Sequence, residues 1–148
     1  MKRIRTLASI VSTAIAMCGA APVLADDHTY SEGEVVNIAK IRTENGHFDD
    51  YMKYLDTTWK TEQEAYKKAG LITNYEVLTV EPRGTDDPDL ILIIRYKNWA
   101  AYDGWTTKFD EVTKQIEGSL SAGDAGMSQR DKIRRTLGSM TAQELKLK

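Results

Sequence analysis

Apolar residues follow a helical period in two separate parts of the chain, and a strand-like run precedes each part. Val35–Arg42 is rich in β-branched residues and predicts a first strand, which ends before the Asn45-Gly46 turn. Beyond the turn, apolar residues recur at the spacings of one helix face, and Gly70 is a favourable stop for that helix. The residues of this face are Phe48, Tyr51, Met52, Leu55, Trp59 and Tyr66.

A second unit of the same kind follows a pair of strands. Leu71–Glu81 predicts the second strand, and Leu90–Ile94 is a nearly continuous apolar run that predicts a third strand buried on both faces. Asn98 is a favourable N-cap for the second helix. The apolar stripe expected on that helix consists of Tyr102, Trp105, Phe109, Val112 and Ile116.

The remainder of the chain predicts a loop and a closing strand. Gly118–Ser128 is small, polar and rich in glycine, which favours a loop, and Gln129–Arg135 favours a short helical turn. Thr136–Leu147 predicts the last strand, with Gly138 as a bulge or a point of close approach. This order of elements predicts an α+β fold of the ferredoxin-like type, with an antiparallel sheet, over residues 34–148.

The first residues have the layout of a cleaved secretory signal peptide. A basic start, Lys2–Arg5, precedes the apolar run Leu7–Met17, which is too short to span a bilayer comfortably. The small residue Ala25 is followed by two acids, so we expect cleavage after Ala25, a signal over residues 1–25 and a flexible leader over residues 26–33. The mature protein is expected to be periplasmic or secreted and free of the membrane.

The position of the cysteine and the net charge exclude or disfavour several classes of function. Cys18, the single cysteine, lies inside the predicted signal, so the mature chain would hold neither a disulfide nor a thiol nucleophile. Loss of the three basic residues of the signal would move the net charge from −2 to −5. An acidic chain without a basic tract is not typical of a nucleic-acid binder. A domain of this size buries only about two-thirds of its unfolded surface, which favours oligomerisation.

Three stretches of the chain resemble the dimeric α+β barrel superfamily: Val35–Tyr51, Asp89–Asn98 and Arg134–Leu145. The last two resemble its uncharacterised secreted members in particular. The superfamily includes cofactor-free monooxygenases, EthD-like and NIPSNAP-like proteins and haem-dependent relatives. The resemblance implies ferredoxin-like subunits, a homodimer with two sheets face to face, and a cleft between each sheet and its helices. Haem-binding members supply a histidine from the later half of the domain, whereas none follows His47 here. We therefore expect no cofactor.

Polar residues on the predicted strands and first helical turns are the candidates for ligand binding. Arg42 and Glu76 are examples that interrupt apolar strands, and a charge that faces a sheet interior needs a partner. The alternative is that such residues reach solvent at strand ends or form salt bridges. The candidate set is Asn37, Lys40, His47, Tyr75, Arg95, Tyr96 and Trp99.

A metal site is not expected in the folded domain, but the N-terminus leaves one possibility open. Cleavage after Ala25 would start the mature chain with Asp26-Asp27-His28. A free amine with histidine at the third position resembles a copper and nickel motif, in which four nitrogens form a square-planar site. The alternative is an incidental histidine in an unstructured leader. The acidic cluster at Asp86–Asp89 lacks the spacing of a calcium loop and is expected to be a solvated turn.

Three functions from different classes remain. The favoured one is a secreted or periplasmic dimer that binds a small hydrophobic or aromatic ligand, and a cleft packed shut by side chains would exclude it. The second is a cofactor-independent monooxygenase or isomerase acting on a small aromatic or carbonyl substrate through Asn37, His47, Tyr75 and Trp99. It requires Asn37 and His47 to point into one pocket. The third is copper or nickel handling through the mature N-terminus. The sequence leaves open whether the protein is an enzyme.

Overall fold

The computed structural model describes residues 28–148, apart from the side chains of residue 117 and residues 120–124. The predicted signal peptide, its cleavage site and the first two residues of the metal motif lie outside the described residues.

Four antiparallel strands form one sheet: β1 (Tyr30–Thr43), β2 (Asn74–Thr79), β3 (Leu90–Tyr96) and β4 (Arg134–Leu147). The order across the sheet is β2-β3-β1-β4, with β1 and β3 in the centre. This order, together with the alternation of strands and helices along the chain, is the ferredoxin-like arrangement. The predicted fold class is confirmed.

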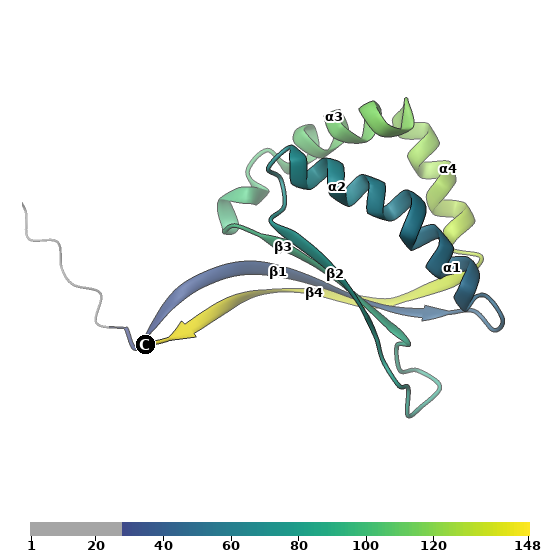
Figure 1. The fold of residues 1–148 in the computed structure, drawn as a ribbon, viewed down its shortest axis with the longest axis horizontal. Coiled ribbons are helices and arrows are strands. Elements are labelled where there is room, and N and C mark those ends of the chain that lie inside the picture. The colour runs from purple at the N-terminus through teal and green to yellow at the C-terminus, as the bar shows by residue number, and fades with distance from the viewer. Residues whose placement is uncertain (1–27) are drawn as a thin grey trace, which may run out of the picture.

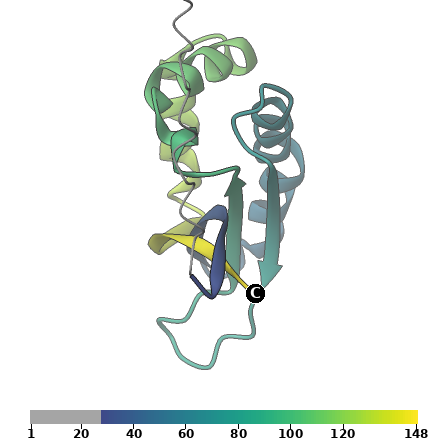
Figure 2. The same cartoon turned by 90° about the vertical axis from the view of Figure 1, so that its left-hand side faces the viewer.

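The helices cover one side of the sheet (Figure 1). The first helical run consists of α1 (Phe48–Tyr54), the π-helical turn η1 (Leu55–Trp59) and α2 (Lys60–Lys68). The second comprises the 3-10 turn η2 (Trp99–Tyr102), α3 (Trp105–Glu117) and α4 (Leu120–Arg130). Seen end-on, α1 and α2 stand on one side and α3 and α4 on the other, above the strands (Figure 2). The sheet therefore has a helix-covered inner face and an outer face that no helix within residues 28–148 covers.

The strand period decides which residues are buried. Because side chains alternate between the two faces of a strand, every second residue of β1 and its partners on β3 point towards the helices. Ile41 and its partner Leu90 are 2% and 1% exposed, and both pack with Tyr51 and Leu55 of the first helical run. A second cluster, around Val35 and its partner Tyr96, lies beneath η2 and α3. These clusters hold both helical runs on the inner face.

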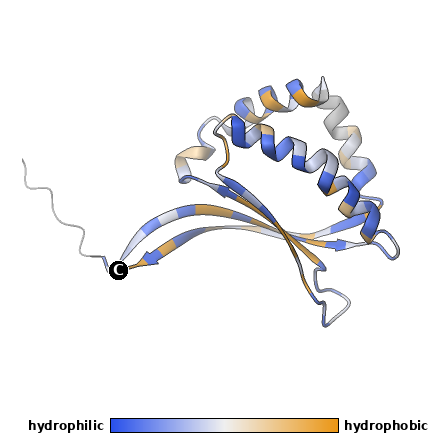
Figure 3. Cartoon of the chain, viewed as in Figure 1, coloured by the Kyte–Doolittle hydropathy of each residue, from blue (hydrophilic) through white to orange (hydrophobic). Residues whose placement is uncertain are grey.

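The outer face is also apolar in its centre. Register and alternation place a row of apolar side chains there, with Ile93 of β3, Ile38 of β1 and Met140 of β4 directly opposite one another. Met140 is 48% exposed, and Ile93 and Ile38 are half-buried. Figure 3 shows apolar segments recurring along the strands, while α1 and α2 are mainly hydrophilic. We call this row, extended by Val36, Leu78 and Ile91, the outer apolar patch.

The sequence predicted that β3 is buried on both faces, but within a single chain only the face towards the helices is buried. Leu90, Leu92 and Tyr96 are buried against the helices, whereas Ile91 and Ile93 on the opposite face remain half-exposed. The apolar run was therefore a correct signal for a strand, but its second face lacks cover in the monomer.

The predicted bulge at Gly138 is confirmed. The register of β1 and β4 shifts between Lys40 and Ile41, where Lys40 pairs with Gly138 and Ile41 pairs with Thr136. Gly138 has a φ of 144°, a backbone conformation that side chains disfavour. The bulge lets β4 bend and sets the faces on which its first residues lie.

The strands β1 and β4 extend together beyond the sheet as a two-stranded arm (Figure 1). β1 starts at Tyr30, inside the segment expected to be a flexible leader, and Tyr30 pairs with Leu147. Local composition did not indicate this pairing because its partner lies at the other end of the chain.

Two helix predictions were wrong in position. The second helix does not begin at Asn98, because the 3-10 turn η2 comes first and Gly104, with a φ of 67°, precedes α3. The segment expected to be a loop, Gly118–Ser128, lies largely in helix α4. Two glycines cost this helix about 1 kcal/mol each relative to alanine. The helix lies in contact with α3, and tertiary packing is the usual source of helix stability in proteins.

Candidate functional site

A cavity of about 380 Å³ lies between the inner face of the sheet and the helices. Its floor is formed by β1, β3 and the first part of β4, and its walls by the first helical run and the end of α4. It is lined by Asn37, Ala39, Ile41, Tyr51, Tyr54, Trp59, Glu62, Leu92, Arg130, Arg134, Thr136 and Ser139. The volume lies within the range of small-molecule sites in proteins. The cleft is thus not packed shut by side chains.

The π-helical turn brings Trp59 into the cavity wall. Tyr51, Leu55 and Trp59 follow one another at intervals of four, and all three are buried. In a regular α-helix, a separation of eight residues would rotate a side chain by about 80° away from the starting face. The wider π turn removes part of this rotation, and such turns are frequent at functional sites. Tyr51 and Trp59 can therefore both line the cavity.

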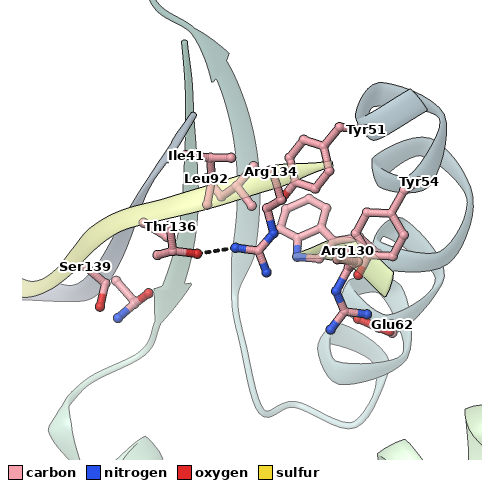
Figure 4. Close-up of a pocket in the computed structure, with 12 residues that line it drawn as sticks. Ile41, Tyr51, Tyr54, Glu62, Leu92, Arg130, Arg134, Thr136 and Ser139 are labelled. Atoms are coloured by element: carbon pink, nitrogen blue, oxygen red, sulfur yellow. Dashed lines mark hydrogen bonds between the residues drawn. The ribbon is translucent and has the colours of Figure 1, made fainter. Parts of the chain in front are cut away.

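Two arginines from the C-terminal part of the chain point into the cavity (Figure 4). The Cζ atom of Arg130 lies 5.0 Å from the centroid of the Tyr54 ring, and that of Arg134 lies 5.8 Å from the centroid of the Tyr51 ring. Both distances are within the range of cation–π attraction. Arg134 also donates a hydrogen bond to the Thr136 hydroxyl. The cavity thus combines aromatic walls with two guanidinium groups.

The two tyrosines of the cavity are hydrogen-bond donors rather than bases. Burial raises the pKa of Tyr51 and the pKa of Tyr54, and Glu62 raises the pKa of Tyr54 further. The positive charges of Arg130 and Arg134 lower both pKa values, but by less than burial raises them. Both phenols therefore stay protonated at neutral pH and offer their O–H groups to a ligand.

Alkaline titration tests this protonation state. Tyr54→Phe is expected to leave the phenolate absorbance of the folded protein at about pH 10 unchanged, because Tyr54 is still protonated there. A pKa that is higher in the folded than in the unfolded state stabilises the fold below about pH 10, and this stabilisation is lost as pH rises through the folded value. In denaturant at the same pH, the variant should show less phenolate than the wild type. Equal losses in folded and unfolded protein would contradict the assignment.

Asn37 is the one residue of the sequence-predicted set that lines this cavity. Its side-chain amide donates a hydrogen bond to the hydroxyl of Thr141 at 3.2 Å. Asn37 therefore has a partner on β4 and presents a polar group to the cavity floor.

Lys40 and Arg95 lie on the outer face of the sheet, opposite the cavity. Lys40 pairs across strands with Ile91 and Gly138. Arg95 donates to Glu76 at 2.9 Å and lies 3.8 Å from Glu34. Arg95 and Glu76 thus form a salt bridge between neighbouring strands, as the alternative to ligand binding predicted.

Two tyrosines of the candidate set belong to other parts of the inner face. Tyr75 lies in a smaller groove on the far side of Trp59, and its hydroxyl donates to Glu64 at 2.6 Å. That hydrogen bond is the main cause that raises the pKa of Tyr75 to about 12. Tyr96 is 2% exposed and packs against the rings of Tyr102 and Trp105.

The other two candidates lie at helix starts and away from the cavity. His47 precedes α1 and contacts Asp50 at 2.8 Å. Trp99 is 50% exposed and donates to Gln143 at 3.0 Å. The oxygenase hypothesis required Asn37 and His47 to share a pocket, and His47 is not among the residues that line the cavity of Asn37.

Sequence reasoning did not select Arg130 and Arg134. The glycine-rich segment before them was expected to be a loop, and Gln129–Arg135 was expected to be only a short helical turn, so neither arginine was placed against the sheet. A strand that begins at Arg134 rather than at Thr136 would have given a signal, because Arg134 and Arg135 are then adjacent on one strand and must point to opposite faces. Arg134 faces the helices, whereas Arg135 is 56% exposed and pairs with Glu44 at 3.1 Å.

Within residues 28–148, no group of three or more His, Cys, Asp or Glu side chains gathers in the manner of a metal site. The acidic turn is held by hydrogen bonds, since Asp87 accepts from the backbone of Arg83 and Gly84. His28 is exposed and stacks on Tyr30 at 5.2 Å, and the copper motif stays a prediction because its first two residues are outside the described part. No helix in that part is long and apolar enough to cross a membrane.

No protein-family model matches the chain, and no curated protein sequence is similar to it. Solved structures that resemble it include HapK from Hahella chejuensis, with a TM-score of 0.50 at 13% identity, over 74% of this chain and 91% of that chain. Another is a dimeric ferredoxin-like protein from an uncultured marine organism, with a TM-score of 0.48 at 10% identity, over 78% of this chain and 95% of that chain. At these identities a likeness concerns the fold alone. The strand order and the likeness to HapK agree on one conclusion, that this chain is an α+β protein with the ferredoxin-like fold.

Proposed function

We propose that this protein is an exported homodimer of the dimeric α+β barrel type that binds a small aromatic ligand in the cavity between its sheet and its helices. The observation that carries the proposal is the cavity itself, with three aromatic side chains in its wall and polar groups on its floor. Aromatic walls with a few convergent polar groups are typical of small-molecule sites.

The outer apolar patch supports the homodimer. Soluble monomers rarely leave a large contiguous apolar surface uncovered. The patch lies at the centre of the sheet, and charged residues such as Arg95 and Glu76 lie beside it. An apolar centre beside polar groups is the usual layout of a protein interface. A second copy, related to the first by a two-fold rotation, would cover the patch with its own identical patch.

The enzyme alternative has weaker support in this geometry. Its four proposed residues do not line a common cavity, and the tyrosines of the cavity have pKa values too high for a general base at neutral pH. Binding needs only the shape and the donors that the cavity offers. Export rests on the signal-peptide layout of the first residues.

Native mass spectrometry of protein exported and purified under gentle conditions tests the proposal. We expect a dimer whose subunits begin at Asp26 and carry a defined additional mass, which would indicate the class of ligand. Denaturing the same sample provides the control, because a noncovalent ligand is then lost while the subunit mass stays. A bare monomer would contradict both the dimer and the filled cavity.

A further inference from the structure

The guanidinium group of Arg134 is desolvated but only partly satisfied. Its side chain is 14% exposed, and its buried Nε has no hydrogen-bond partner. Its Nη1 donates to Thr136, whereas its Nη2 lies 3.8 Å from a carboxylate oxygen of Asp131, beyond hydrogen-bond distance. Asp131 is itself 65% exposed, so its attraction is screened by solvent. Nε is covered by protein atoms, whereas Nη2 lies at the end of the guanidinium group and can donate a charge-assisted hydrogen bond to a ligand carboxylate.

The charge of the cavity lining points to the same kind of partner. Two arginines and one glutamate line the cavity, which leaves one positive charge in excess. Arg130 lies over the Tyr54 ring, and Glu62 lines the same cavity (Figure 4). A positive charge taken out of water needs an opposite charge or a full set of acceptors. A ligand with a single negative charge would complete this balance.

The aromatic residues that line the cavity indicate the uncharged part of that ligand. Tyr51, Tyr54 and Trp59 present aromatic surfaces, which favour a flat aromatic group. Thr136 and Ser139 lie on the β4 side of the cavity, with Thr136 beside Arg134 and Ser139 farther from it (Figure 4). We propose that the cavity binds a small aromatic carboxylate, with the carboxylate on Nη2 of Arg134 and the ring among these three aromatic side chains. This inference rests on the proposed ligand-binding function and names the chemical class of the ligand.

Calorimetric titration of the full mature protein with naphthoate and with its neutral analogue naphthamide tests the inference. The two probes share a ring system and differ in charge. We expect naphthoate to bind about tenfold to a hundredfold more tightly, since hydrogen bonds between charged groups contribute more than neutral ones. Arg134→Gln should abolish this preference while leaving naphthamide binding unchanged.

Arg135→Gln is the matched control, because it removes the same charge from the next residue of the same strand on the opposite face. It should leave both affinities unchanged. Equal effects of the two variants, or equal affinity of the wild type for the two probes, would overturn the carboxylate assignment and leave the cavity as a ligand site. Should Arg134→Gln fail to fold, the ratio of the two affinities in the wild type still decides. Absence of binding by either probe, together with no retained mass in native spectrometry, would overturn the ligand-binding function itself.

Discussion

Leu90→Ala is expected to lower the free energy of unfolding by about 2–5 kcal/mol. Leu90 is 1% exposed at the start of β3, where it pairs with Ile41 of β1 and packs against Tyr51 and Leu55. Removing its side chain leaves a cavity between the sheet and the first helical run. Chemical denaturation with fluorescence detection measures the loss.

The control for this prediction is Leu147→Ala. Leu147 is 84% exposed at the end of β4, and truncating it should change stability by no more than about 0.5 kcal/mol. Similar losses for the two variants would show that the cluster around Leu90 does not hold the helices to the sheet.

Ile93→Asp is expected to convert the proposed dimer into a monomer. Ile93 lies at the centre of the outer apolar patch, opposite Ile38 on β1 and Glu76 on β2. In a dimer that covers this patch, the new carboxylate would be buried without a partner, which should weaken association at least about a hundredfold. Analytical ultracentrifugation over a range of protein concentrations measures the change.

Thr79→Asp supplies the comparison, since it places the same acid at an exposed position of β2 that faces away from the patch. It should leave the dimer intact, and circular dichroism should show folded protein for both variants. A dimer that survives Ile93→Asp would place the interface elsewhere on the surface.

The two proposed properties occupy opposite faces of one sheet. Ala39 of β1 faces the ligand cavity, while its neighbours Ile38 and Lys40 face the outer side. Alternation along a strand therefore lets one short segment serve both a binding site and an interface. Substitutions on one face can test one property without touching the residues of the other.

The fold could be predicted where the signal was local and periodic. The spacing of Tyr51, Leu55 and Trp59 predicted a buried helix face, and all three are buried. The β-branched run of β1 and the apolar run of β3 predicted strands that the structure confirms. Gly138 predicted a bulge because a glycine inside a strand has few other roles. In each case, neighbouring residues carried the information.

Predictions failed where distant contacts decide the conformation. The composition of α4 favours a loop, and the helix forms in contact with α3. The start of β1 lies in a polar segment, and it is a strand because the end of β4 pairs with it. Neither contact can be predicted from the residues of the segment itself.

The candidate site, too, was predictable where the signal was local and not where distant contacts decide. Asn37 was selected as a polar residue on an apolar strand, and it lines the cavity. Arg130 and Arg134 were not selected, because a charged segment before a strand is usually exposed to solvent. In the structure, the packing of α4 and the bulge in β4 direct their side chains into the cavity.

Sequence alone thus determined the ferredoxin-like fold class and the buried positions Tyr51, Leu55 and Trp59, because periodicity indicates which face of an element is buried. It did not predict that Phe48 is exposed and Gln63 buried. Tertiary structure alone decided where the cavity lies, which two arginines enter it and which sheet face remains uncovered. These depend on contacts between residues far apart in the chain, such as Arg134 with Tyr51, and such contacts follow from packing rather than from any local pattern.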